Sequence, residues 1–250
     1  MQLSGKVVVV TGASRGIGAA IARALAARGA TVVGTGRDAA ALTAVMCEVG
    51  GDAVLGDVRD PGHAEMVVAH ARDKHGRLDA VVVNAGVGYT GPFADMPADR
   101  VDDLVDVNVR APIQLARAAV PELTRHDESA LVFVTSIAGA LLVPRESLYS
   151  ATKAALEAFA EVLREEVRGS GLHVGTVVPG AVDTEFFAHR GAPYDRSFPR
   201  PIKPEPVAAG ALRVIEDSAE RVVVPGWMRG PVLLRRLAPR RYRTLSRRYG

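Results

Sequence analysis

The stretch VVVVTGASRGIG, at residues 7–18, constrains the fold of this chain more than any other part of the sequence. Four consecutive valines are typical of a strand that is buried on both faces, as in a parallel sheet. Gly12, Gly16 and Gly18 follow, and a helical run, IGAAIARALAARG, begins among them. Such a unit brings backbone N–H groups and the positive end of a helix dipole close to a phosphate. Because the spacing is not G-x-G-x-x-G, a tight turn without a ligand is the alternative.

Strand-like and helix-like segments alternate along the rest of the chain. Further strands are predicted at residues 31–35, 53–56, 80–83, 131–135, 173–178 and 221–224. Helices are predicted between them at residues 38–49, 61–75, 99–124, 149–168 and 207–217. Repeated βα units with short links favour right-handed crossovers. The pattern therefore predicts an α/β fold with a single Rossmann-type domain over residues 1–228, a doubly wound parallel sheet of about seven strands with helices on both faces.

Polar and glycine residues follow several of these apolar strands directly. They are Gly12, Asp57, Asn84, Ser136 and the pair Pro179-Gly180. In a doubly wound sheet, ligands bind outside the carboxyl ends of the strands. The sequence therefore predicts a binding site at this edge of the sheet.

Composition limits the setting in which the protein works. The 250 residues include one cysteine, Cys47, which excludes an internal disulfide and suits a reducing compartment. No positively charged segment followed by an apolar run precedes the first strand, so we expect no signal peptide. No apolar run approaches the roughly 18 residues that span a bilayer. We therefore expect a cytoplasmic protein.

The C-terminal tail, residues 229–250, carries most of the basic character. It holds eight arginines, and removing them from a net charge of +3 leaves −5 for the rest. Apolar residues approximate one helical stripe that is interrupted at Pro239: Leu234, Leu237, Tyr242, Leu245 and Tyr249. A basic amphipathic segment fits weak contact with an anionic membrane or an acidic partner, and a solvated tail or a subunit contact is the alternative. No base-reading motif accompanies the arginines, so we expect no nucleic-acid partner.

The residues after the second strand bear on the choice of cofactor. An acid at the end of this strand would bind an adenosine 2′-hydroxyl, but this sequence has Gly36 followed by Arg37. Arg15 lies inside the glycine-rich turn. Two guanidinium groups fit a 2′-phosphate, so the sequence favours NADP(H) over NAD(H). Asp38 is placed either to accept a hydrogen bond from a ribose or to cap the next helix.

Tyr149 and Lys153 stand one helical turn apart and share a face of a predicted helix. An ammonium beside a phenol favours the phenolate, which makes a tyrosine usable as an acid/base near neutral pH. This pair alone is a weak signal. Ser136 at a strand end and Asn108, an unfavourable residue inside a helix, strengthen it.

Taken together, these motifs resemble the short-chain dehydrogenase/reductase family, over residues 6–224. The family's TGxxxGxG motif falls on residues 11–18, its Asp-Val on Asp57-Val58 and its Asn-Ala-Gly on residues 84–86. The family's four catalytic residues fall on Asn108, Ser136, Tyr149 and Lys153. The residues that we expect to contact the cofactor are Gly12, Ser14, Arg15, Gly16, Ile17, Gly18, Arg37, Asp57, Val58, Asn84, Ala85, Gly86, Tyr149, Lys153, Pro179, Gly180, Val182 and Thr184.

The resemblance implies direct hydride transfer between a substrate carbon and the nicotinamide, without a metal. Tyr149 would exchange a proton with the substrate oxygen, which Ser136 would hydrogen-bond. Lys153 would bind the nicotinamide ribose and lower the Tyr149 pKa, and Asn108 would hold a water that links Lys153 to solvent. Asp57 would accept from the adenine amino group, although a turn aspartate is an equally good interpretation. The resemblance also implies a homodimer or homotetramer formed through residues 99–124 and 149–168.

Three segments after strand ends, residues 87–93, 138–143 and 185–203, supply apolar and aromatic side chains for a substrate pocket. The candidate substrate contacts are Ser136, Tyr149, Leu142 and Phe186. We expect a largely apolar pocket for a ketone or secondary alcohol, with residues 185–206 as a lid; simple packing under a loop is the alternative. The alternative function is a regulator that binds NADP(H) without catalysis.

Overall fold

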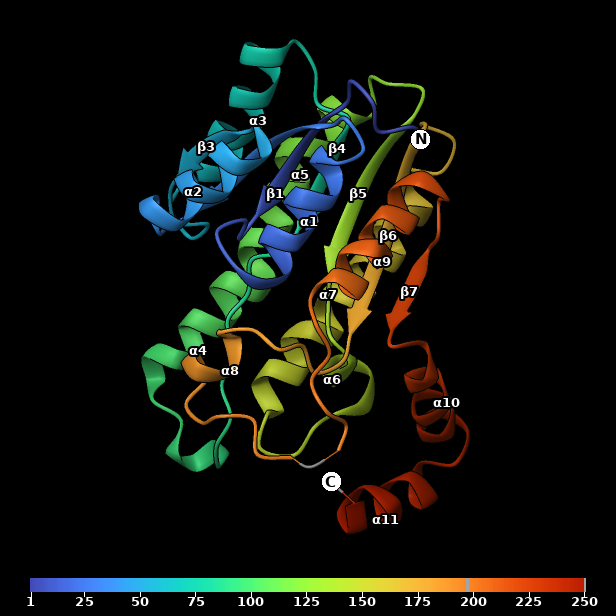
Figure 1. The fold of residues 1–250 in the computed structure, drawn as a ribbon. Coiled ribbons are helices and arrows are strands. Elements are labelled where there is room, and N and C mark those ends of the chain that lie inside the picture. The colour runs from blue at the N-terminus through green and yellow to red at the C-terminus, as the bar shows by residue number, and fades with distance from the viewer. Residues whose placement is uncertain (197, 250) are drawn as a thin grey trace.

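Seven parallel strands form one sheet in the order β3-β2-β1-β4-β5-β6-β7 (Figure 1). The computed structural model describes residues 1–196 and 198–249. The strands are β1 Val7–Thr11, β2 Thr31–Gly36, β3 Asp52–Leu55, β4 Ala80–Val83, β5 Ser129–Val134, β6 Leu172–Pro179 and β7 Arg221–Val224. The order reverses between β1 and β4, so the predicted doubly wound Rossmann-type sheet is confirmed.

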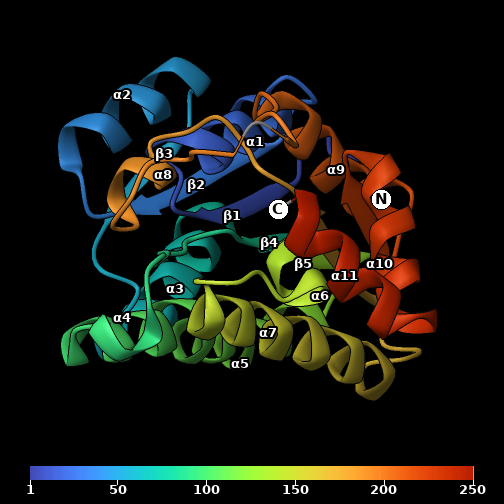
Figure 2. The ribbon, with the colours of Figure 1, turned by 90° about the horizontal axis from the view of Figure 1, so that it is seen from below.

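Helices cover both faces of the sheet (Figure 2). One layer consists of α1 Gly16–Ala26, α2 Ala39–Val49 and α9 Glu205–Glu216, and the other of α3 His63–His75, α4 Ala98–Val105, α5 Ala111–Leu123 and α7 Ser147–Glu166. Successive side chains of a strand point to opposite faces. Val8 and Val10 therefore pack into the core under the first layer, and Val7 and Val9 into the core under the second. This explains why β1 is apolar at every position.

The predicted helix over residues 99–124 is interrupted. A π-helical turn, Asp106–Arg110, separates α4 from α5, and Asn108 at its centre is fully buried. Such a turn widens the helix and frees backbone groups at a site where a polar side chain enters the interior. The unfavourable position of Asn108 in a regular helix was the signal for this irregularity.

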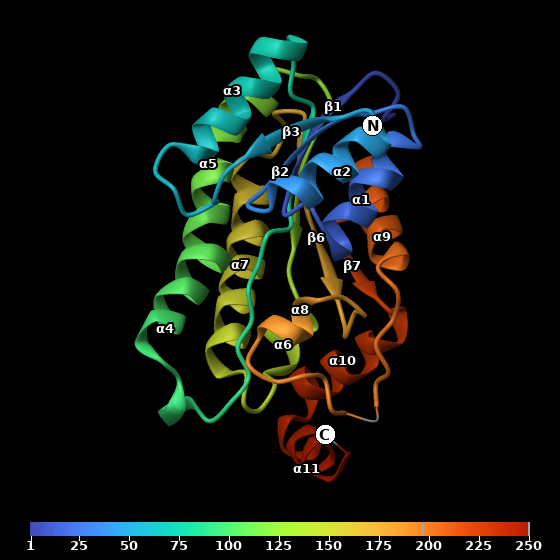
Figure 3. The same cartoon turned by 60° about the vertical axis from the view of Figure 1, so that its left-hand side comes forward.

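The remaining helices lie beyond the carboxyl ends of the central strands (Figure 3). They are η1 Phe93–Asp95, α6 Ile137–Leu141, α8 Phe186–His189, η3 Gly226–Met228, α10 Arg229–Leu237 and α11 Pro239–Tyr249. The tail therefore folds as two helices that break at Ala238, beside Pro239, where the sequence predicts an interruption. No helix within residues 1–196 and 198–249 has both the length and the apolar character needed to cross a bilayer.

Candidate active site

The glycine-rich turn after β1 allows close backbone approach. Gly12 and Gly16 have φ angles of +65° and +53°, in the left-handed region that favours glycine. A Cβ at Gly18 would lie 2.0 Å from the Gly12 carbonyl oxygen, so any larger residue would push α1 away from the turn. The turn therefore keeps an open surface at the N-terminus of α1, where an anion is stabilised.

Hydrogen bonds from the next strand hold this turn in place. The Thr11 hydroxyl accepts from the backbone N–H groups of Asn84 and Ala85, at 2.9 and 3.0 Å. The Asn84 side-chain amide donates to the Thr11 carbonyl oxygen at 2.9 Å. Asn84 was predicted to contact the cofactor, and here its amide group fixes the loop that faces the cleft.

A cleft of about 1040 Å³ runs from the glycine turn to the N-terminal end of α7. Of the predicted site residues, it is lined by Gly12, Ser14, Arg15, Gly16, Ile17, Arg37, Asn84, Ala85, Gly86, Ser136, Tyr149, Lys153, Pro179, Gly180, Val182, Thr184 and Phe186. The predicted residues outside its lining are Gly18, Asp57, Val58, Asn108 and Leu142. Val58 instead borders a separate cavity of about 20 Å³ between α3 and α5.

Ser136, Tyr149 and Lys153 lie together at the inner end of the cleft. Ser136 is the N-cap of α6, and its Oγ accepts from the Ala138 N–H at 3.1 Å. Ser136 lies close enough to the Tyr149 hydroxyl to lower its pKa. Lys153 Nζ donates to the Val134 carbonyl oxygen at 3.1 Å and lies 6.0 Å from the centre of the Tyr149 ring. The structure therefore brings these three residues together in one cleft.

Burial has the largest effect on the pKa values of Tyr149 and Lys153. It raises the pKa of Tyr149 to about 12, against a lowering by the nearby Ser136 hydroxyl. It lowers the pKa of Lys153 to about 8, since an ammonium is poorly solvated there. The expected net lowering of the Tyr149 pKa by Lys153 is therefore not found: both groups are removed from water, and desolvation outweighs their neighbours. In this structure the phenol is the form present at neutral pH.

Asn108 lies outside the lining of the cleft and hydrogen-bonds to two segments that border it. Its Oδ1 accepts from the Val87 N–H at 3.0 Å, and its Nδ2 donates to the Val87 carbonyl oxygen at 2.9 Å. Nδ2 also lies 3.2 Å from the hydroxyl of Thr152, on the helix that carries Tyr149 and Lys153. Its side chain therefore ties the segment after β4 to α7.

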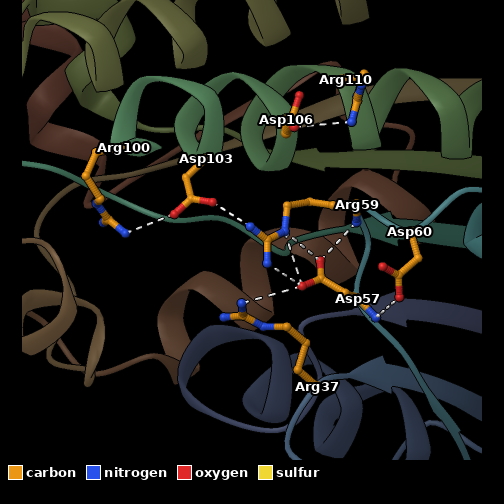
Figure 4. A network of polar contacts seen from close by, with 8 residues as sticks. All are labelled: Arg37, Asp57, Arg59, Asp60, Arg100, Asp103, Asp106 and Arg110. Carbon is orange, nitrogen blue, oxygen red and sulfur yellow. Dashed lines mark hydrogen bonds and ion pairs between the residues drawn. The ribbon is translucent and has the colours of Figure 1, made fainter. Parts of the chain in front are cut away.

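Charged side chains gather at the β2 side of the cleft (Figure 4). Asp57 accepts from Arg59 through both carboxylate oxygens, and Arg59 also pairs with Asp103 at 2.5 Å. Arg37 lies 3.6 Å from the Asp57 carboxylate. Arg59 holds the pKa of the Asp57 carboxyl below its usual range. The sequence analysis missed Arg59, although its position two residues after Asp57 favours such a local pair.

Arg15 is also paired. Its guanidinium contacts the Asp38 carboxylate and donates to Glu185 at 2.8 Å. Asp38 caps α2 by accepting from the Ala41 N–H at 3.0 Å, which is the helix-capping alternative of the sequence analysis. The Asp38 carboxylate therefore pairs with Arg15 as well as capping α2. Side-chain exposures of 47% for Arg15 and 63% for Arg37 leave both accessible.

The substrate end of the cleft has an aromatic wall. The rings of Tyr149 and Phe186 are 5.6 Å apart, centre to centre. Leu141 and Val143 line the cleft, whereas Leu142 between them is 48% exposed. Leu142 has a φ of +56° at the end of α6, and this conformation turns the chain so that its neighbours face inward. Leu142, a predicted substrate contact, therefore lies outside the lining of the cleft, and its two neighbours lie within it.

A buried ion pair in the same wall was not predicted. Glu146 and Arg190 lie 2.5 Å apart and are 9% and 6% exposed. The guanidinium of Arg190 also stacks on the Phe187 ring, at 4.7 Å from its centre. Burial raises the pKa of the Glu146 carboxyl despite the nearby guanidinium. The two residues are 44 positions apart in the chain, so no local pattern could have paired them.

Comparison with known proteins agrees with this arrangement. Residues 6–195 match the family model described as short chain dehydrogenase. The oxidoreductase UcpA of Escherichia coli O157:H7 is 34% identical over 227 residues, 88% of this chain and 85% of that protein. The ketoacyl reductase HetN of Nostoc is 32% identical over 234 residues, 89% of this chain and 79% of that protein.

A solved structure of similar fold is the 3-ketoacyl-(acyl-carrier-protein) reductase from Brucella melitensis, complexed with NADH. Its TM-score is 0.83 at 26% identity, with 89% of this chain and 97% of that chain covered. The chain therefore belongs to the short-chain dehydrogenase/reductase family. Within that family it is an oxidoreductase with the Rossmann fold.

Proposed function

We propose that this protein is an NADP(H)-dependent oxidoreductase that interconverts a carbonyl and a secondary alcohol, with Tyr149 as the acid/base. The observation that carries the proposal is the meeting of Ser136, Tyr149 and Lys153 in one cleft with the open glycine turn. The turn has room for a dinucleotide because Gly12 has no side chain. A Cβ at Gly12 would lie 3.1 Å from the Ala85 Cα and would narrow the cleft beside the turn. When bound, the nicotinamide supplies or accepts the hydride.

The protein's own residues handle the proton. In the reducing direction, the neutral Tyr149 hydroxyl donates its proton to the substrate oxygen as negative charge develops there. Ser136 donates a second hydrogen bond to the same oxygen. Lys153, held by the Val134 carbonyl, would bind the nicotinamide ribose. Asn108 and Thr152 keep α7 in register with the segment after β4.

We propose NADP(H) as the preferred cofactor, because Arg15 and Arg37 remain exposed at the end of β2, where a 2′-phosphate would lie. Asp38 and Asp57 compete for these guanidinium groups, and a phosphate carries more charge than either carboxylate. Double substitution of Arg15 and Arg37 by alanine should raise the KM for NADPH by at least about tenfold, with little change for NADH.

For the substrate we propose a ketone with an apolar chain, of the 3-ketoacyl kind. The names of the HetN and Brucella relatives point to this class. Leu141, Val143 and Phe186 give the wall beside Tyr149 an apolar surface.

The protein's single cysteine, Cys47, is exposed, and an exposed free cysteine suits a reducing compartment. We therefore propose that the reaction takes place in the cytoplasm.

A pair of buried serines tests the proposal. Ser136 and Ser150 are 7% and 3% exposed, but only Ser136 reaches Tyr149; the Ser150 hydroxyl accepts from the Val143 N–H at 3.2 Å. NADPH oxidation with a panel of aliphatic 3-ketoesters should fall at least about a hundredfold in Ser136→Ala and in Tyr149→Phe, and less than about threefold in Ser150→Ala. Binding of NADPH, measured by calorimetry, should persist in all three variants. A wild-type protein that binds NADPH but turns over no ketone or alcohol would favour the regulatory alternative.

A further inference from the structure

The two tail helices are built onto the substrate end of the molecule (Figures 1 and 3). Arg235 donates to the Ala140 carbonyl oxygen at 2.5 Å, and the Tyr242 hydroxyl donates to the Leu141 carbonyl oxygen at 3.2 Å. Val232 is buried in a small core with Val178 and Val223. The tail therefore has a fixed position against α6, whose residue Leu141 lines the cleft.

The outer face of α10 combines arginines with exposed leucines. Leu233 and Leu237 are 57% and 76% exposed, and Arg229 and Arg236 are exposed beside them. At 3.6 residues per turn, these four positions fall within a sector of about 100°. The anchored Arg235 lies on the opposite side of the helix, and the buried Val232 lies about 40° from Arg236, at one edge of the sector. This side of α10 therefore presents apolar leucine side chains beside positively charged arginines.

Positive charge is unopposed along this part of the chain. From Gly226 onward the sequence has no acidic residue. The guanidinium groups of Arg229, Arg236, Arg240 and Arg241 have no ion-pair or hydrogen-bond partner among the residues that the structure describes. We call these four arginines, together with Leu233 and Leu237, the tail face.

An exposed aromatic pair includes a residue of η3, the short helix that immediately precedes α10 in the chain. Trp227, on η3 just before α10, is 48% exposed and stacks on Phe198, which is 63% exposed, with ring centres 5.4 Å apart. Trp combines an apolar body with a polar N–H group and is enriched at the boundary between water and lipid headgroups.

We propose that the tail face docks the protein onto an anionic bilayer surface. Arginines attract the headgroups, while Leu233, Leu237 and Trp227 enter the headgroup boundary without spanning the membrane. A second copy of the chain is a poorer occupant, because a symmetric contact would bring the arginines of one tail face against those of the other. Duplex nucleic acid would satisfy the arginines but leave the leucines and the aromatic pair in water.

The docking places α6 close to the lipid. A ketone with an apolar chain partitions into a bilayer, so attachment at this end would bring the cleft to its substrate. This consequence, unlike the docking itself, rests on the proposed function. Binding experiments without a substrate therefore test the docking alone.

Trp227 provides a direct signal, because it is the only tryptophan in the chain. The full-length protein should pellet with vesicles of equal parts phosphatidylglycerol and phosphatidylcholine, and Trp227 emission should shift to the blue. Replacing Arg229, Arg236, Arg240 and Arg241 by Gln should lower the partition coefficient at least about tenfold. The double variant Leu233→Ser/Leu237→Ser should keep salt-sensitive binding but reduce the blue shift.

A matched control removes the same charge elsewhere. Arg23, Arg28, Arg72 and Arg213 are exposed on or beside α1, α3 and α9, outside residues 99–124 and 149–168, and their replacement by Gln should leave vesicle binding unchanged. Equal pelleting of wild type and the tail-face variant would overturn the proposal. Equal binding to vesicles of pure phosphatidylcholine, or retention on duplex DNA without retention on vesicles, would do so too. Loss of NADPH turnover with intact vesicle binding would contradict the proposed function and leave the docking standing.

Discussion

At the scale of single residues, the site pairs a phenol and an amine in a place where neither is solvated. Burial moves the two pKa values in opposite directions, to about 12 for Tyr149 and about 8 for Lys153, so at pH 7 the phenol is neutral and the lysine is still mostly an ammonium. Glu146 raises the Tyr149 pKa further and Arg190 lowers it. A proton donor that stays protonated suits ketone reduction at neutral pH, whereas alcohol oxidation needs a base that only rising pH or bound ligand can supply.

Lys153 therefore carries a cost to stability that its function requires. Its pKa falls from 10.5 in the unfolded chain to about 8, so at neutral pH the folded state holds a poorly solvated ammonium at a cost of roughly 3 kcal/mol. Lys153→Met removes this cost and loses one hydrogen bond, worth about 1 kcal/mol. The variant should be about 2 kcal/mol more stable at pH 7, with a Tm about 4–8 °C higher.

The sign of the pH dependence distinguishes this cause from better packing. The penalty is complete below pH 8, shrinks as pH rises toward 10.5, and is absent above it. The stability gain of Lys153→Met should fade over that window in thermal denaturation scans, while its ketone reduction stays lost. Lys203→Met, at an exposed position, is the control and should change Tm little. A gain that is constant from pH 7 to pH 10.5 would contradict a desolvated ammonium.

At the scale of elements, most of the site was predictable because it depends on local order in the chain. The sequence VVVVTGASRGIG determines a buried strand, a tight turn and a helix, and each polar residue after a strand end reaches the same sheet edge. The Tyr149–Lys153 spacing needs only one helical turn. Glu146–Arg190 and Arg15–Asp38 were missed because they join segments whose approach depends on the path of loops. Leu142 has a left-handed backbone conformation that the sequence did not predict, and it lies outside the cleft that its neighbours Leu141 and Val143 line.

The glycine turn makes a prediction at this scale. In Gly18→Ala the new Cβ would meet the Gly12 carbonyl oxygen at 2.0 Å, so α1 must move away from β1. We expect a loss of roughly 2–4 kcal/mol in urea denaturation and no measurable NADPH binding in calorimetry. Gly230→Ala is the matched control: Gly230 is also helical, its Cβ would meet nothing within 4 Å, and it should be neutral or about 1 kcal/mol more stable. Unimpaired NADPH binding by Gly18→Ala would contradict this prediction, because it would show that the glycine turn tolerates a side chain at this position.

At the scale of the whole molecule, one of the two helical layers exposes apolar side chains to solvent. The layer of α4, α5 and α7 exposes Val105, Ile113 and Val162, at 41%, 36% and 58%. These helices lie side by side on one face of the sheet (Figure 2). The family resemblance implies a dimer or tetramer through the same residue ranges, 99–124 and 149–168. A repeated contact between copies would cover this apolar surface and leave the tail face, at another end of the molecule, free.

Charge placed on this layer should therefore dissociate the oligomer. In Ile113→Arg/Val162→Arg, like charges would face each other across a symmetric contact, and light scattering after size exclusion should show a smaller assembly than wild type at micromolar concentration. Leu55→Arg is the control, since Leu55 is 53% exposed on the edge strand β3, outside these helices, and should keep the wild-type mass. A wild-type protein that is already monomeric, or a double variant of unchanged mass, would rule out assembly through α5 and α7. Because the tail face lies outside this contact, the double variant should still bind anionic vesicles.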